Sequence, residues 1–243
     1  MDTLKRFYRN VLQNRVSFVS GTNEDRIHML ELESHLATVT YGNFTLTDAI
    51  RPSLDLTIIP EQGYKYDRLR WGAEGIMSCH RTHTRRPMPT LVISISLERL
   101  FDTFLDLLNP LGDSVHAVLE TSHCYSGAHR LALHREHIDL PVLKSFLYDY
   151  EDLLINDGCT AISVLAPRIH TEIRFDEHKL IFVYAKSLPP FERILCRHNI
   201  LQNDSMQLLT DAEHVHITRD EYYQHFKTLQ MLLGMDESFT AAR

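Results

Sequence analysis

Histidine and cysteine side chains, which bind zinc and supply nucleophiles, gather between residues 79 and 137, a span that holds seven of the 15 histidines. Except for His116, they fall in two polar segments, SCHRTHTRRPMP (78–89) and TSHCYSGAHRLALHREHI (121–138). We predict both segments to be long irregular loops, and such loops on a compact scaffold often carry function.

The first segment is cationic. It holds His80, Arg81, His83, Arg85 and Arg86 and no acidic residue. Because guanidinium groups match carboxylates and phosphates, we expect these five side chains to bind an anionic group or the acidic surface of a partner protein. The alternative is a solvated loop whose arginines pair with the protein's own carboxylates.

The second segment offers a set of metal ligands. These are His123, Cys124, His129, His134 and His137. Imidazole and thiolate are zinc ligands, and a thiolate beside histidine is also a nucleophile. A zinc site, a Cys124 nucleophile, and ordinary surface or partly buried histidines are three alternatives for this segment.

The two segments are not expected to share one ion. A right-handed β-α-β connection makes the strand after the first segment parallel to the strand before the second. The segments then lie at opposite edges of the sheet, about 20 Å apart for strands of about six residues. Zinc ligands must come within ~2.0–2.3 Å of one ion.

His214 and His216 form a weaker candidate. Side chains alternate along a strand, so both imidazoles share a face, as two ligands of a His-x-His metal site would. The alternative, which we favour from sequence, is a solvent-facing strand edge.

Several well-known catalytic motifs are absent from the sequence. There is no GxxxxGK[ST], GxGxxG or GxSxG, which argues against P-loop NTPases, Rossmann dehydrogenases and α/β-hydrolases. The tetrapeptide His134-Arg135-Glu136-His137 is one residue shorter than the HExxH motif of metalloproteases.

Composition points to a globular protein of the cytoplasm. The 243 residues carry a net charge of −7, which disfavours general nucleic-acid binding. The start of the sequence lacks the apolar core of a signal peptide, and no apolar run approaches the ~20 residues of a membrane helix. We therefore expect no membrane association. The four cysteines form no CxxC pair, so we expect reduced thiols.

The periodicity of apolar residues predicts helices over 2–14, 97–108, 140–155 and from Pro189. A hairpin is expected across 176–179, between strands 172–175 and 180–185. A further strand is expected to start at Met206. Thr218 is expected to cap the last helix, with Glu221 three residues on completing a capping box.

These elements predict an α+β fold in which a β-β-β-α-β-α unit occurs twice. The expected organisation is an N-terminal helix with short strands (1–52), a first repeat with the two inserted loops (53–157), a second repeat (158–235) and a C-terminal tail (236–243). Short matches between the halves, such as Ile59-Pro60 with Ala166-Pro167, favour this duplication.

The resulting hypothesis is a binding protein without catalytic activity or cofactor, a protein–protein adaptor or an inhibitor or immunity-type protein. Its acidic body would present the Arg/His-rich segment to another protein. The alternative is a zinc-dependent hydrolase whose His/Cys site lies in 121–138, with zinc as its cofactor.

Overall fold

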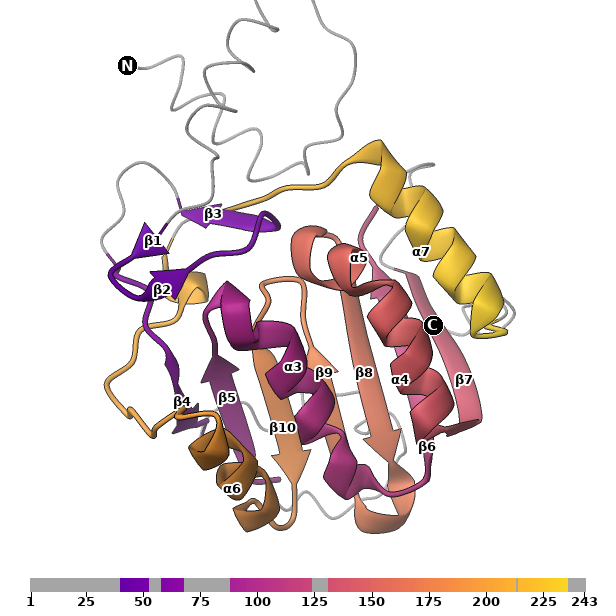
Figure 1. Ribbon diagram of the computed structural model, residues 1–243, viewed down its shortest axis with the longest axis horizontal. Helices are drawn as coiled ribbons and strands as arrows, with labels where there is room; N and C mark the ends of the chain where they lie inside the picture. Colours follow the sequence, from indigo (N-terminus) through magenta and orange to yellow (C-terminus); the bar gives the residue numbers. More distant parts are fainter. Residues whose placement is uncertain (1–39, 53–57, 68–87, 124–130, 213, 236–243) are drawn as a thin grey trace, which may run out of the picture.

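The computed structural model describes residues 40–52, 58–67, 88–123, 131–212 and 214–235 (Figure 1). The predicted helix over 2–14, the Arg/His-rich residues 80–86 and residues 124–130 lie outside this part of the chain. The described residues confirm the α+β class: five α-helices accompany a seven-stranded sheet.

Every neighbouring pair of strands in the large sheet is antiparallel. In spatial order the strands are β4 (Gly63–Tyr66), β5 (Thr90–Ser94), β10 (Ile181–Ala185), β9 (Thr171–Phe175), β8 (Thr160–Ala166), β6 (Ser114–Thr121) and β7 (Leu131–Asp139). The three strands β8, β9 and β10 form a meander between β5 and β6. The tandem duplication is not confirmed, since strands of both predicted repeats interleave in one sheet.

The helices are α3 (Leu97–Leu107), α4 (Leu140–Asp149), α5 (Glu151–Asn156), α6 (Pro189–Arg197) and α7 (Asp220–Leu232). Helices α3, α4 and α5 lie over one face of the sheet (Figure 1). Single 3₁₀ turns occur at Asn109–Leu111, Pro167–Ile169 and Leu209–Asp211. No helix among the described residues is long and apolar enough to cross a membrane.

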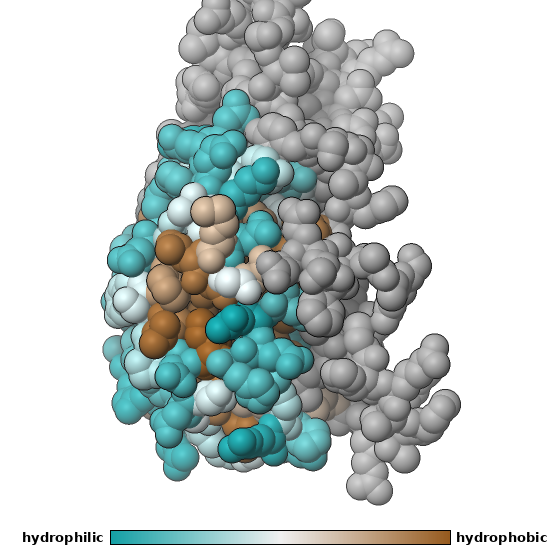
Figure 2. Space-filling view, turned by 90° about the vertical axis from the view of Figure 1, so that its right-hand side faces the viewer, coloured by the Kyte–Doolittle hydropathy of each residue, from teal (hydrophilic) through white to brown (hydrophobic). Residues whose placement is uncertain are grey.

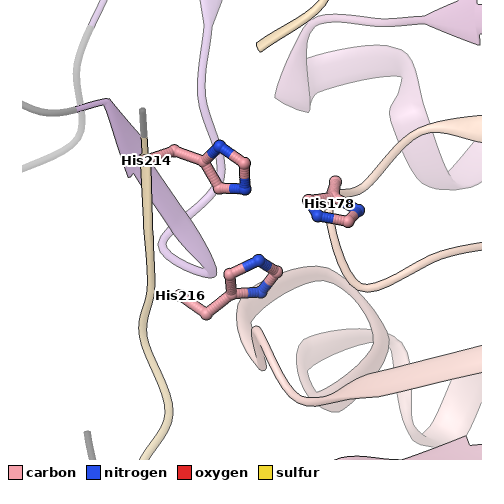
Figure 3. A group of neighbouring side chains, drawn as sticks. All are labelled: His178, His214 and His216. Atoms are coloured by element: carbon pink, nitrogen blue, oxygen red, sulfur yellow. The ribbon is translucent and has the colours of Figure 1, made fainter. Parts of the chain in front are cut away.

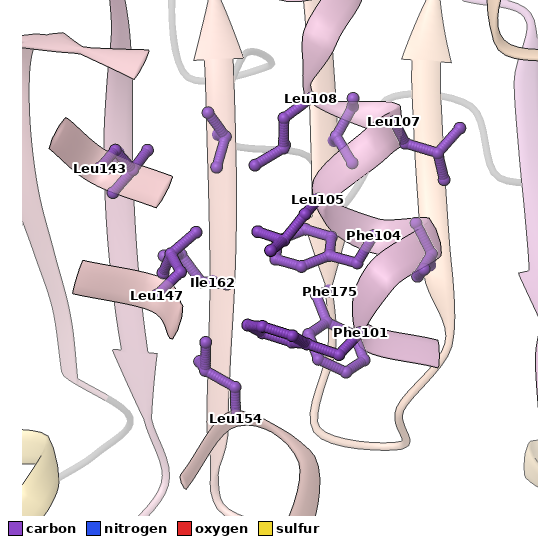
Figure 4. Packing of buried hydrophobic residues seen from close by; sticks show 14 of the residues in the cluster. Phe101, Phe104, Leu105, Leu107, Leu108, Leu143, Leu147, Leu154, Ile162 and Phe175 are labelled. Carbon is purple, nitrogen blue, oxygen red and sulfur yellow. The ribbon is translucent and has the colours of Figure 1, made fainter. Parts of the chain in front are cut away.

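The main core lies between these helices and the sheet (Figure 4). The apolar stripe of α3 is buried as its spacing predicts, and the ring of Phe104 packs 5.0 Å from that of Phe175 on β9. Strand β8 is buried along its whole length, which explains its nearly continuous run of small and apolar residues.

The opposite face of the sheet carries a buried ion pair. Arg174 of β9 donates two hydrogen bonds to the carboxylate of Glu120 on β6, at 2.8 and 2.7 Å. This bidentate geometry satisfies both charges across the intervening strand β8.

Two small ribbons sit beside the large sheet. Strands β1 (Thr40–Tyr41) and β2 (Phe44–Thr45) form a hairpin around Gly42, whose φ of +60° suits glycine. Strand β3 (Ile50–Pro52) pairs antiparallel with β11 (His214–His216).

Several predictions about individual elements were wrong. Residues 131–138 are not loop but part of the edge strand β7; because most of this strand is exposed, its polar residues hide the strand pattern. The predicted helix over 140–155 is divided at Tyr150 into α4 and α5. The strand expected from Met206 forms only at His214, as β11.

The predicted capping box at Thr218 is also wrong. Helix α7 begins at Asp220 with Arg219 as its N-cap, and no side chain caps it. The hydroxyl of Thr218 instead lies 2.8 Å from Nε2 of His123, so a contact between distant segments replaces the local one.

Apolar side chains also gather on the side of the molecule that carries α7 and β7 (Figure 2). On α7 the side chains of Met231 and Leu232 are 75% and 49% exposed. The buried Phe104 of α3 and the exposed Met231 of α7 allow a stability test that compares the two environments.

We expect Phe104→Ala to lower the free energy of unfolding by about 3–5 kcal/mol, since it removes a fully buried ring and leaves a cavity. Met231→Ala, on an exposed position, should change it by no more than about 0.5 kcal/mol. Urea denaturation measures both, and equal effects would contradict the described core.

Candidate metal centre

The described structure does not gather the predicted zinc ligands into one set. His134 and His137 lie on β7, where the ring of His137 faces that of His116 at 4.7 Å between centroids. Among described residues neither joins a group of three metal-ligating side chains. Cys124 and His129 lie outside the described residues, as do His80, Arg81, His83, Arg85 and Arg86.

Three other histidines do come together. They are His178, in the turn between β9 and β10, and His214 and His216 on β11 (Figure 3). One ligand nitrogen from each ring lies within 4.8 Å of the other two. In a tetrahedral zinc site with bonds of 2.0–2.1 Å, the nitrogens would be about 3.3 Å apart, so modest side-chain movements close the site around an ion.

The ribbon β3–β11 positions two of the three rings. His214 and His216 alternate with the buried Val215 and therefore project from the same face of β11. Their backbone register is fixed by pairing with β3, where His214 lies opposite Pro52 and His216 opposite Ile50.

Gly158 holds this ribbon against the start of β8. Its N–H donates to the carbonyl of Ile217 at 2.7 Å, and the N–H of Ile217 donates to the carbonyl of Ala49 at 2.8 Å. A Cβ at Gly158 would lie 2.4 Å from the carbonyl oxygen of Ala49, so only glycine allows this approach.

The turn between β9 and β10 positions the third ring. The Asp176 carboxylate accepts hydrogen bonds from the backbone N–H groups of His178 and Leu180, both at 2.9 Å. Its second oxygen lies 2.8 Å from Nδ1 of His178. One side chain thus shapes the turn and orients the imidazole.

Each of the three rings uses Nδ1 for an oxygen acceptor. Nδ1 of His178 faces the Asp176 carboxylate, that of His214 the carbonyl of Ala212 at 2.8 Å, and that of His216 the carbonyl of Gly158 at 2.7 Å. Carbonyl and carboxylate oxygens only accept, so each Nδ1 carries a proton. The nitrogen left for an ion is therefore Nε2 on all three rings.

The electrostatics favour unprotonated rings at His214 and His216. Burial, with a smaller contribution from His178, lowers the pKa of His216 to about 4. Burial also lowers the pKa of His214. Burial opposes ionisation of Asp176, but its hydrogen bonds from His178 and Leu180 outweigh that effect and hold its pKa below the ordinary value. At neutral pH, His214 and His216 therefore present lone pairs rather than protons.

A second group, His123, Asp157 and Cys159, also brings ligand atoms within 4.8 Å of one another. Here the ring nitrogens of His123 already lie 2.6 Å from the hydroxyl of Thr121 and 2.8 Å from that of Thr218. The buried Asp157 carboxylate accepts hydrogen bonds from the N–H of Cys159 and the hydroxyl of Thr160. The polar atoms of this group satisfy one another, as expected of a structural network.

The sequence alone suggested part of the three-histidine group. The alternation of His214 and His216 was visible in the sequence, although a solvent-facing edge was the preferred interpretation. His178 was missed as a ligand. The sequence feature that could have identified it is Asp176, an acidic residue two positions before His178 inside the predicted tight turn.

Comparisons with known proteins found no matching family model, no similar curated protein and no similar solved structure. The assignment of the site therefore depends on its own geometry.

We expect Gly158→Ala to displace the β3–β11 ribbon, because the new Cβ collides with backbone. Hydrogen exchange of the amides at 214–217 should become faster than in the natural protein. As a control, Gly112→Ala strains a backbone φ of +91° where a Cβ meets nothing within 4 Å. Unchanged exchange at 214–217 in Gly158→Ala would contradict this close approach.

Proposed function

We propose that the protein is a zinc-binding metalloprotein whose ion is held by Nε2 of His178, His214 and His216. The observation that carries the proposal is that all three rings are hydrogen-bonded in the same way. Each Nδ1 is hydrogen-bonded to an oxygen acceptor, and one ligand nitrogen from each ring faces the other two. Metal-ligating histidines characteristically have this second hydrogen bond, which fixes the tautomer.

The donor chemistry selects the class of metal. Imidazole nitrogen suits zinc, copper, iron and nickel, whereas calcium and magnesium prefer oxygen ligands. We name zinc because it tolerates three histidines in tetrahedral geometry and needs no redox partner. This proposal keeps zinc as the cofactor of the alternative from sequence but moves the site from 121–138 to the three-histidine group.

The ion would also join two parts of the fold. His178 belongs to the β9–β10 turn of the large sheet, and the other two ligands belong to the β3–β11 ribbon. Binding to the folded state alone stabilises it, by about 2.7 kcal/mol at a zinc concentration 100 times the Kd.

The binding of an anionic group or an acidic partner surface by His80, Arg81, His83, Arg85 and Arg86 remains a separate prediction. Those residues lie outside the described part of the chain. Charge reversal at Arg81, Arg85 and Arg86, followed by a pulldown, tests it independently of the metal.

We expect the purified protein to hold one zinc ion per chain and its melting temperature to rise with added zinc. His178→Ala, His214→Ala and His216→Ala should each abolish stoichiometric binding, because two imidazoles do not complete the site. His225→Ala, on an exposed position of α7, is the matched control. Elemental analysis and thermal denaturation measure the outcome, and full zinc content in all three ligand variants would refute the proposal.

We expect Asp176→Asn to weaken zinc binding by about 10–100-fold, the usual effect of losing a carboxylate behind a ligand histidine. The substitution keeps the shape of the side chain but replaces the charged acceptor of His178. Competition with a chromogenic chelator measures the affinity. Unchanged affinity would show that the Asp176–His178 contact does not orient a ligand.

A further inference from the structure

The chain passes from the proposed zinc ligands into helix α7 through a short connection (Figure 1). His216 is the last residue of β11, and α7 begins at Asp220. Ile217, Thr218 and Arg219 lie between them. Two of the three proposed ligands therefore belong to the strand that leads directly into this helix.

Hydrogen bonds hold the connection to segments distant in sequence. The N–H of Ile217 donates to the carbonyl of Ala49, and the carbonyl of Ile217 accepts from the N–H of Gly158. The hydroxyl of Thr218 lies 2.8 Å from Nε2 of His123, which follows β6. Because both residues are bonded in this way, α7 cannot move away from the sheet by extending the connection without breaking these contacts.

Neither β11 nor α7 is long enough to be stable by itself. Strand β11 pairs with β3 over three residues, and an isolated two-stranded pairing is marginal in water. Helix α7 has 13 residues, within the ~12–15 at which isolated helices are only marginally stable. Each element therefore depends on its packing, and the bonded connection makes each depend on the other.

One apolar face of α7 packs against the rest of the protein. Tyr222, Phe226 and Leu229 are at most 2% exposed and belong to the main core, and the helix also contacts α5. The ring of Tyr223 lies 5.5 Å from that of His123, between centroids. Detachment of α7 would therefore expose buried apolar side chains and break the contacts around His123.

We propose that zinc controls the docking of α7, an inference that rests on the proposed zinc site. When α7 detaches, β11 leaves with it, so His214 and His216 move away from His178. The ion then loses two of its three ligands. Zinc binds the docked state and not the detached one, so occupancy of the site favours docking. Release of zinc allows the apolar face of α7 to become accessible more often.

The size of this coupling follows from linkage. At a zinc concentration 100 times the Kd, the fraction of molecules with α7 detached falls about 100-fold. The coupling is also reciprocal, so a substitution that detaches α7 must weaken zinc binding.

Hydrogen exchange of the full chain, with and without added zinc, tests the first effect. We expect the amides of α7 to exchange up to about 100-fold more slowly in the zinc-loaded protein. The amides of α6, which lies outside the ribbon and its connection, are the internal control and should slow much less. Equal slowing in both helices would show that zinc stabilises only the whole fold, and would overturn the coupling.

A pair of substitutions on α7 tests the reciprocal effect. Leu229→Asp places a carboxylate in the core and should detach the helix, whereas Met231→Asp places the same group on a side chain that is 75% exposed. In a chelator competition, we expect zinc binding to be at least tenfold weaker in Leu229→Asp and unchanged in Met231→Asp. Slow exchange of the α3 amides verifies that the body of each variant remains folded.

The outcomes distinguish this inference from the zinc site itself. Stoichiometric zinc with unchanged exchange in α7 overturns the coupling and leaves the site intact. Natural zinc affinity in a Leu229→Asp variant whose α7 amides exchange freely also overturns the coupling. If Leu229→Asp unfolds the whole chain, the exchange measurement on the natural protein decides. Absence of zinc binding in the natural protein overturns both proposals.

Discussion

The geometry of the three-histidine group depends on the hydrogen bonds of the Asp176 carboxylate. It accepts two backbone N–H groups in the turn between β9 and β10 and, through its other oxygen, faces Nδ1 of His178. The hairpin would otherwise leave those N–H groups without partners at a buried position, which costs free energy. The same bonds that close the turn therefore aim an imidazole at the β3–β11 ribbon.

The sheet topology determines where that imidazole arrives. The meander of β8, β9 and β10 occupies the middle of the sheet, so the β9–β10 turn and the segment before β8 emerge close together. Gly158, in that segment, contacts the ribbon and also accepts the hydrogen bond of His216. Three segments distant in sequence thus hold the three imidazoles in place, which would reduce the ordering that the proposed binding of an ion requires.

The two histidine groups differ in how their ring nitrogens are hydrogen-bonded. Around His123, both ring nitrogens have hydroxyl partners, and Asp157 is satisfied by Cys159 and Thr160. Around His178, the carbonyls and the carboxylate use Nδ1 of each ring, and one ligand nitrogen of each ring lies near the other two. Such an arrangement is the one that the proposed zinc ion would complete.

The sequence by itself determined the local elements. The apolar stripe of 97–107, the hairpin around 176–179 and the proline-led helix at 189–197 follow from periodicity and turn chemistry, and the alternation of His214 and His216 follows from the two-residue repeat of a strand. Tertiary structure decided the rest: β7 became an edge strand despite its polar residues, and Thr218 turned from capping α7 to contacting His123. The tertiary structure also brought His178 to the β3–β11 ribbon. Local spacing sets which way a side chain points, but which distant segment it meets depends on how the strands are ordered in the sheet, and no short stretch of sequence contains that order.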